Sequence, residues 1–290
     1  MLYRRLLMHK KSQDTTVNIL DYLTIEALAD GLTASLSVNA CEYCIDGDGN
    51  WMSLEANTAT EAINTGHTLS FRGKLTPTST SGIGTFLITK DCNLKGNCMS
   101  MLFGDDGKDI FSLKSEAYAF FGLFRGNTTI IDASNLLLPA TEISQRCYRH
   151  MFFGCTNLTK APQLPATCLQ NYCYYYMFSD CTSLLEAPQL PATVLSNYCY
   201  QFMFRNCTKI IEAPVLEAKI LTTGSYANMF QGCTSLSWIK MLAEDISPSN
   251  CLINWVSNVS LTGTFIKSAS MNNLSSGASG IPSGWTVEYE

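Results

Sequence analysis

Charged residues are scarce in this sequence. Asp, Glu, Lys and Arg make up 15% of its 290 residues, against about 25% in an average soluble protein. The formal net charge is −5, and the only basic cluster is Arg4, Arg5, Lys10 and Lys11, so we expect no nucleic-acid partner. The hydrophobic fraction of 46% is too high for a disordered chain and favours a folded, β-rich protein.

Long apolar runs are also missing. The run between Arg5 and His9 is only Leu6-Leu7-Met8, which is too short for the core of a secretory signal peptide. No segment approaches the ~18 apolar residues that cross a bilayer. We therefore expect no signal peptide and no membrane span. A place on a virion or a cell surface would require another route, such as release of assembled particles by lysis; otherwise the chain is cytoplasmic.

The motifs of common enzymes are absent. There is no Gly-rich phosphate loop, no Gly-x-Ser-x-Gly and no His-Glu-x-x-His. Asp105-Asp106 is a carboxylate pair, but it stands in a Gly-flanked turn, where Asp is common. We therefore assign no catalytic, cofactor-binding or metal-binding residue, and we expect a protein that is not an enzyme and needs no cofactor.

Cysteine is abundant, with 13 residues, an odd number. Without a signal peptide the thiols are expected to be reduced. Cys41 and Cys44 have the CxxC spacing of a zinc site, but no second CxxC follows. The only CxxH, at Cys147 and His150, lies inside a repeat whose other copies lack the His. Buried free thiols are the favoured interpretation, because unpaired Cys is among the most often buried residues.

One pattern dominates the second half of the chain. Met-Phe-x-x-Cys-x-x-Leu/Ile begins at Met151, Met177, Met203 and Met229, and 177−151, 203−177 and 229−203 each equal 26. A fixed period of this length predicts a solenoid, in which each repeat buries its apolar residues only against its neighbours. Adjacent rungs lie about 4.8 Å apart, so like residues should form ladders, with Phe178 and Phe204 one rung from each other.

The repeat also predicts local structure. Pro cannot donate to a ladder, so Pro162 and Pro188 limit the strand to roughly 158–161 and its equivalents. A turn, a short extended piece and a helical turn are expected ahead of each Met-Phe pair. Cys181 is expected to be buried as a small apolar residue, so a Ser there should leave a hydroxyl without a partner, at a cost of about 1–3 kcal/mol.

The chain divides into five predicted parts. Residues 1–20 form a tail and 21–103 a small β-sandwich or barrel-like domain, followed by a junction at 104–120. The repeats occupy 121–260 and a C-terminal cap occupies 261–290. The first domain is predicted from short alternating stretches, namely 22–26, 32–38, 43–45, 51–54, 68–72, 85–89 and 93–101. Between two of them, Asp46 to Asn50 starts like a calcium loop, but the later ligand positions do not match, so a hairpin turn is expected.

The repeats resemble the BspA-like leucine-rich repeats. That family's unit runs roughly Ala-Phe-x-x-Cys-x-x-Leu-x-x-Ile and then Pro, and the matching stretch here runs from Met177 through Phe178, Cys181 and Leu184 to Pro188. The resemblance covers about 123–265; the repeat of 26 residues is longer than the usual unit and carries an extra Leu-Pro-Ala-Thr. It implies a mainly β solenoid and a role in adhesion. The whole layout is similar to proteins of gut anaerobes and of the tailed phages that infect them.

Two functions outside enzymology remain open. The first is a binding or adhesion protein that uses one face of the repeats to recognise a surface protein or a glycan. The second is a structural or assembly component of a virion, whose partners are other virion proteins. Outward positions that vary between repeats are the candidate recognition face: Lys160, Gln163, Glu186, Gln189, Glu212, Tyr175, Tyr176 and Gln201. Tyr175, Tyr176, Gln201 and Phe202 can form an aromatic platform, unless these side chains pack between repeats. The oligomeric state does not follow from the sequence.

Overall fold

A computed structural model describes residues 17–271 and 274–290, and its architecture is mainly β. The expected tail therefore lies outside the described residues, except for 17–20. The regular elements are η1 Ile19–Asp21, β1 Leu23–Ala27, β2 Ala34–Leu36, β3 Cys41–Ile45, β4 Met52–Leu54, β5 Thr68–Arg72, β6 Phe86–Ile88, β7 Cys92–Asn97, α1 Ser100–Phe103, η2 Gly104–Asp109, β8 Ser112–Leu113, β9 Ile130–Leu137, β10 Glu142–Ile143, β11 Trp238–Met241, β12 Thr264–Lys267 and β13 Thr286–Tyr289.

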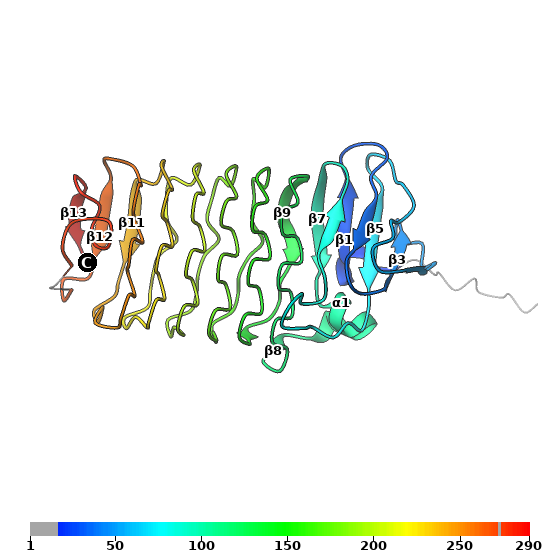
Figure 1. The fold of residues 1–290 in the computed structure, drawn as a ribbon, viewed down its shortest axis with the longest axis horizontal. Coiled ribbons are helices and arrows are strands. Elements are labelled where there is room, and N and C mark those ends of the chain that lie inside the picture. The colour runs from blue at the N-terminus through cyan, green and yellow to red at the C-terminus, as the bar shows by residue number, and fades with distance from the viewer. Residues whose placement is uncertain (1–16, 272–273) are drawn as a thin grey trace, which may run out of the picture.

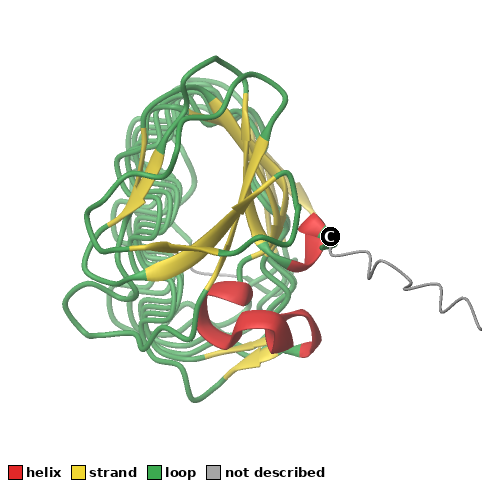
Figure 2. Ribbon diagram, turned by 90° about the vertical axis from the view of Figure 1, so that its right-hand side faces the viewer, coloured by secondary structure: helices red, strands yellow, loops and turns green. Residues whose placement is uncertain are grey.

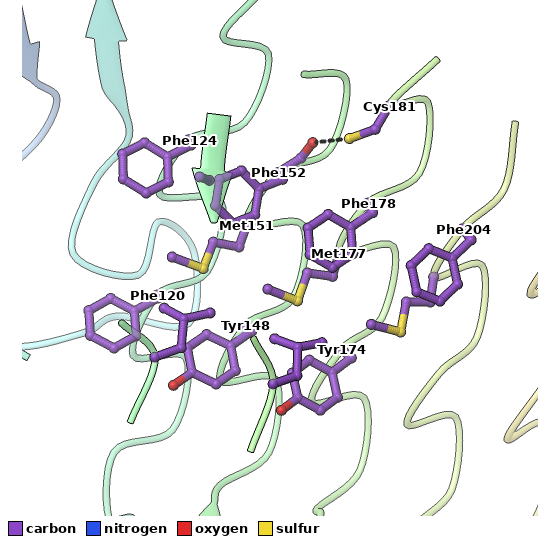
Figure 3. Packing of buried hydrophobic residues seen from close by; sticks show 14 of the residues in the cluster. Phe120, Phe124, Tyr148, Met151, Phe152, Tyr174, Met177, Phe178, Cys181 and Phe204 are labelled. Atoms are coloured by element: carbon purple, nitrogen blue, oxygen red, sulfur yellow. Dashed lines mark hydrogen bonds between the residues drawn. The ribbon is translucent and has the colours of Figure 1, made fainter. Parts of the chain in front are cut away.

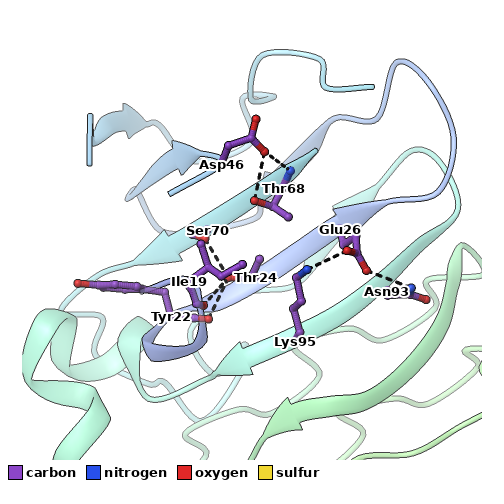
Figure 4. Close-up of polar contacts among 9 residues, drawn as sticks. All are labelled: Ile19, Tyr22, Thr24, Glu26, Asp46, Thr68, Ser70, Asn93 and Lys95. Carbon is purple, nitrogen blue, oxygen red and sulfur yellow. Dashed lines mark hydrogen bonds and ion pairs between the residues drawn. The ribbon is translucent and has the colours of Figure 1, made fainter. Parts of the chain in front are cut away.

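Six strands form the largest sheet, in the order β4-β3-β5-β1-β7-β9. Its polar contacts follow the strand pairing (Figure 4): Lys95 Nζ lies 2.8 Å from Glu26 Oε1, and the hydroxyls of Thr24 and Ser70 lie 2.9 Å apart in the buried interior. A second sheet, β2-β6, contacts this one through Phe71 and Phe86, whose ring centroids are 4.9 Å apart. β3 and β4 are antiparallel neighbours, which confirms the expected hairpin at 46–50.

The N-terminal sheet continues into the repeats without a break. β7 pairs in parallel with β9, which lies beyond the predicted boundary at residue 103. The buried core is likewise one cluster, and the ring of Phe86 stacks on Phe124 at 5.8 Å. The domain limits drawn from the sequence stay a prediction, but the sheet and the core both cross the limit at residue 103. The N-terminal strands thus cover one end of the stack of repeats (Figure 1).

Each 26-residue repeat lies beside the next, and viewed along the stack the loops follow one behind another (Figure 2). Backbone hydrogen bonds join neighbours at regular intervals: Tyr174 N–H donates to Cys199 O at 3.0 Å, and Phe178 N–H donates to Met203 O at 3.0 Å. The intervening amides bond within the repeat, as Met177 N–H does to Tyr174 O at 3.0 Å. Backbone groups are therefore satisfied without long strands.

The expected helical turn ahead of each Met-Phe pair is wrong. The segment 170–181 consists instead of five overlapping turns, each closed by an i to i−3 hydrogen bond. Tyr172, Tyr176 and Asp180 have φ of 60°, 57° and 64°, and a left-handed residue every four positions interrupts helical geometry. Extended backbone appears where it was predicted, but in the repeats between β9 and β11 it forms only single parallel bridges, such as Lys160 to Glu186.

The predicted ladders are present inside the stack. Ring centroids are 5.5 Å apart for Phe152 and Phe178 and 5.8 Å for Phe178 and Phe204, with nearly parallel planes. Tyr148, Tyr174 and Tyr200 form a second row at 5.7 Å intervals, and the methionine column lies between the two rows (Figure 3). Stacked rings of this kind add roughly 0.5–1.5 kcal/mol per pair to their area burial.

The buried cysteines are free thiols with a hydrogen-bonding role. Cys155, Cys181, Cys207 and Cys233 each lie 3.0–3.1 Å, sulfur to oxygen, from a phenylalanine carbonyl of the preceding repeat, as Figure 3 shows for Cys181 and Phe152. The expectation that a Ser at 181 lacks a partner is therefore wrong, because Phe152 O is within reach. Twelve of the 13 cysteines are buried, and Cys168 is exposed.

The last repeat ends on a parallel sheet in the order β11-β12-β13. Trp255 continues the phenylalanine row, with its ring 6.3 Å from Phe230 and 6.0 Å from Phe265. β12 and β13 both lie within the segment 261–290 that was predicted as a C-terminal cap. β13 is the outermost strand, and its side chains are mostly exposed.

Candidate recognition surface

The eight candidate residues fall on two different sides of the repeat. We call the side that carries the parallel bridges at Asp132, Lys160, Glu186, Glu212 and Trp238 the bridge side. Lys160, Gln163, Glu186, Gln189 and Glu212 belong to it. Tyr175 and Tyr176 lie in the turns of 170–181, and Gln201 lies in the equivalent turns of the next repeat; we call this side the turn side. The single recognition face predicted from the sequence therefore combines residues from two separate surfaces.

The bridge side is hollowed between repeats. One hollow of 490 Å³ is lined by residues that include Glu186, Gln189, Lys209 and Glu212. A smaller one of 190 Å³ lies beside it and includes Lys160 and Gln163. Lys160 Nζ also lies 3.2 Å from Asp132 Oδ2, as an ion pair. The candidate residues of this side are thus together, but one of their charges is already paired.

The larger hollow lies where the bridges are interrupted. Parallel bridges join Lys160 to Glu186 and Glu212 to Trp238, but among the described residues none joins Glu186 to Glu212. Leu185 and Ile211 line the same hollow and are 53% and 57% exposed. On the turn side the same two repeats remain hydrogen-bonded, through Tyr176 N–H and Gln201 O for example. Among the described residues no bridge joins Val194 to Ile220 either, so the backbone hydrogen bonds between these two repeats lie on the turn side.

The turn side has an unusual backbone. Each repeat places three residues at positive φ, four positions apart, at the point where a β-turn favours Gly or Asn. The repeats near the C-terminus follow that preference, with Gly224, Asn228, Gly232, Asn250, Asn254 and Asn258. The earlier repeats keep it at the third position with Gly126, Gly154 and Asn206, and Asp180 in one repeat, but mostly not at the first two positions. There Tyr118, Arg146, His150, Tyr172, Tyr176, Tyr198 and Phe202 have φ between 56° and 61°. Left-handed backbone costs such residues roughly 1–2 kcal/mol each.

These side chains stack on one another at the surface. The rings of Tyr176 and Phe202 are 4.3 Å apart at 18°, and those of Tyr172 and Tyr198 are 4.8 Å apart at 8°. Tyr175 contacts Tyr176 at 4.6 Å and is half-buried. Burial raises the pKa of Tyr175 and of Tyr176, so both phenols keep their protons at neutral pH. The rings therefore pack between repeats and are also partly exposed, so the two alternatives predicted for the aromatic platform are not exclusive.

Arginines complete the aromatic rows. The Arg146 guanidinium carbon lies 5.4 Å from the ring centre of Tyr118 and 5.1 Å from that of Tyr172. The Arg149 carbon lies 5.5 Å from the ring centre of Phe121 and 4.9 Å from that of Tyr175. Each guanidinium thus has a ring from the preceding and from the following repeat, an arrangement in which cation–π attraction contributes about 0.5–2 kcal/mol.

The positive charge of this cluster is not neutralised within the described part of the chain. None of the seven ion pairs among the described residues involves Arg125, Arg146, Arg149 or Arg205. Burial, followed by the charges of Arg149 and Arg125, lowers the pKa of His150 to about 4. His150 is therefore neutral at pH 7, with its Nδ1 buried and without a hydrogen-bond partner.

The sequence-based analysis missed the arginines and His150 as part of a surface. The signal was present in the repeat columns. Gly224 and Asn250 follow Tyr172 and Tyr198 in the same column at intervals of 26, and Gly and Asn mark left-handed positions. Where Tyr or Arg stands in a column that elsewhere holds Gly or Asn, its side chain occupies a left-handed position that its residue type does not favour.

Comparison of the chain with protein-family models, with curated proteins and with solved structures found no match. Within residues 17–271 and 274–290, no helix has the length and apolar character that crossing a membrane requires. Function is therefore inferred from the two surfaces of the repeats.

Proposed function

We propose that this chain is a non-enzymatic binding protein that recognises a surface protein or a glycan. In this proposal residues 121–260 form a solenoid of the BspA-like leucine-rich-repeat type, and the turn side of the repeats is the recognition surface. The protein would act on a virion or at a cell surface. The regular hydrogen bonds between repeats and the continuous aromatic rows support a rigid, extended scaffold of that kind.

The observation that carries the proposal is the set of half-buried aromatic side chains at left-handed positions. Asn or Gly at Tyr176 and Phe202 would satisfy the same backbone at lower cost, as Asn228 and Asn254 do further along the chain. Strain that the fold does not require is typical of functional surfaces. Clustered aromatic residues are also typical of binding hot spots.

The test is binding of the purified chain to a glycan array and to whole bacterial cells. A double variant, Tyr176→Asn with Phe202→Asn, removes two rings at positions that tolerate Asn. The matched control, Glu186→Gln with Glu212→Gln, changes the bridge side. The proposal predicts that the first variant loses binding by at least tenfold and that the control retains it.

Two results would overturn the proposal. One is absence of binding to any glycan or cell together with co-purification with capsid or tail components, which would favour an assembly role. The other is binding that depends on the bridge-side residues and is unaffected by the aromatic variant.

A further inference from the structure

The turn side of this acidic protein carries four arginines that make no ion pair among the described residues, and a carboxylate, Asp180. Arg125, Arg146 and Arg149 lie in two adjacent repeats and Arg205 lies two repeats further on; all four are at least partly exposed. The chain as a whole carries a net charge of −5, so this cluster is opposite in sign to the molecule that bears it. Charges of one sign gathered on one surface steer and bind partners of the other sign.

The two central arginines are oriented by their neighbours. Rings lie near both Arg146 and Arg149 on either side along the stack, and Arg146 Nη1 donates a hydrogen bond to the hydroxyl of Tyr118. Among the described residues, no acceptor lies within hydrogen-bond distance of the buried Nε of either arginine. A guanidinium held in a plane with its remaining N–H groups at a half-exposed edge is suited to two-pronged contact with a carboxylate or sulfate.

The surroundings discriminate between kinds of polyanion. Nucleic-acid bases bind by stacking on open aromatic faces, but Tyr172 and Tyr176 already stack on Tyr198 and Phe202. Around the arginines, the hydroxyl of Tyr118 accepts a hydrogen bond from Arg146, and Tyr172 and Tyr175 are partly exposed beside Arg146 and Arg149. Hydroxyls next to cations match a partner that carries both hydroxyl and anionic groups, which is the chemistry of an acidic sugar chain.

We propose that the cluster of Arg125, Arg146 and Arg149, with the tyrosines stacked around it, binds an acidic polysaccharide through its carboxylate or sulfate groups. The assignment rests on the proposed function and narrows it to one class of glycan and one site. Arg146 and Arg149 contact the anionic groups, and the tyrosine hydroxyls contact the sugar hydroxyls. Arg125, close enough for its charge to act on His150, adds to the local positive charge.

The experiment measures binding of the full chain to four immobilised probes: polygalacturonate, dextran sulfate, neutral dextran and poly-glutamate. Oligo-thymidine serves as a fifth. The expected result is binding to one or both acidic polysaccharides, at least tenfold tighter than to neutral dextran, poly-glutamate or oligo-thymidine. Polygalacturonate and dextran sulfate separate carboxylate from sulfate recognition.

Three variants locate the site. Arg146→Gln with Arg149→Gln should weaken binding of the acidic polysaccharide at least tenfold. Arg146→Lys with Arg149→Lys keeps the charge but removes the planar group, and should recover only part of the loss. Lys209→Gln removes one exposed charge from the bridge side and should bind as the unmodified chain does. Thermal unfolding of each variant confirms that it is folded, and the Lys pair serves if the Gln pair is not.

Some outcomes would overturn the inference and leave the proposed function standing. Equal binding of neutral and acidic dextrans, equal binding of poly-glutamate or oligo-thymidine, or unchanged binding by the Gln pair would each do so while cell or glycan-array binding persists. If the unmodified chain binds neither these probes nor any array glycan or cell, the proposed function fails as well.

Discussion

The earlier repeats and those near the C-terminus share one backbone but differ in what they display on it. In both, three residues of each repeat have positive φ at four-residue intervals. Between 224 and 258 all six of these positions are Gly or Asn, whereas Tyr, His, Arg and Phe fill most of them between 146 and 202. The comparison teaches that the backbone does not need aromatic residues there. Fold and surface are separable in this part of the chain.

Two phenylalanines provide the sharpest way to break this comparison. Phe178 is completely buried in the inner row, whereas Phe202 is half-exposed on the turn side. Phe178→Ala should lower the free energy of unfolding by about 3–5 kcal/mol, because it leaves a cavity in the stack. Phe202→Ala should cost only about 0.5–1.5 kcal/mol, because the partly exposed ring loses mainly its stacking on Tyr176. Urea denaturation measures both, and equal losses would contradict the separation of core and surface.

Exchanging the occupants of one column tests the strain itself. Asn254→Phe puts an aromatic ring at φ 51° on an exposed position with no aromatic neighbour from the preceding repeat in its column, and should cost about 1–2 kcal/mol. Phe202→Asn relieves similar strain but loses stacking on Tyr176, worth about 0.5–1.5 kcal/mol. Its stability should therefore stay within about 1 kcal/mol of the original chain. A large loss from Phe202→Asn would show that the rings are structural.

The smallest expected effect is a pH dependence from His150. Its pKa in the folded chain is about 4, below the ordinary value near 6.5, so between these values the unfolded chain binds more protons. Stability is therefore highest above pH 6.5 and falls as the pH drops towards 4, by about 1 kcal/mol at pH 5 after allowance for solvent access. Thermal unfolding from pH 7 to 5 should show a shallower decline for His150→Asn, which cannot titrate. Parallel declines would contradict the burial of His150.

Much of the inner structure could be predicted from the sequence. The 26-residue period placed Phe152, Phe178 and Phe204 in one row, because only neighbouring repeats can bury such residues. The turns could not be predicted in the same way, because Tyr and Phe do not favour left-handed backbone and so concealed it. Cooperation between repeats decides that conformation through hydrogen bonds such as Tyr176 N–H to Gln201 O.

The candidate site was predicted only in part. Tyr175, Tyr176 and Gln201 do lie together, but Lys160 and Glu186 belong to the other side. A repeat column shows which residues align along the stack. It does not show on which side of the repeat that column lies. The pairing of Arg149 with Phe121 and Tyr175 depends on side-chain directions, which no spacing in the sequence records.

The regular bonding between repeats has a consequence for how such a protein can change its length. Amides along the turn side donate to the residue 25 positions further on, from Tyr172 to Asn197 and again from Tyr198 to Thr223. Duplication of one genetic unit would therefore insert a module whose upper and lower edges already match. The terminal strands could remain unchanged while the turn side gained one more repeat. The length of the stack and the number of binding positions on it could thus change without a change in how each repeat folds.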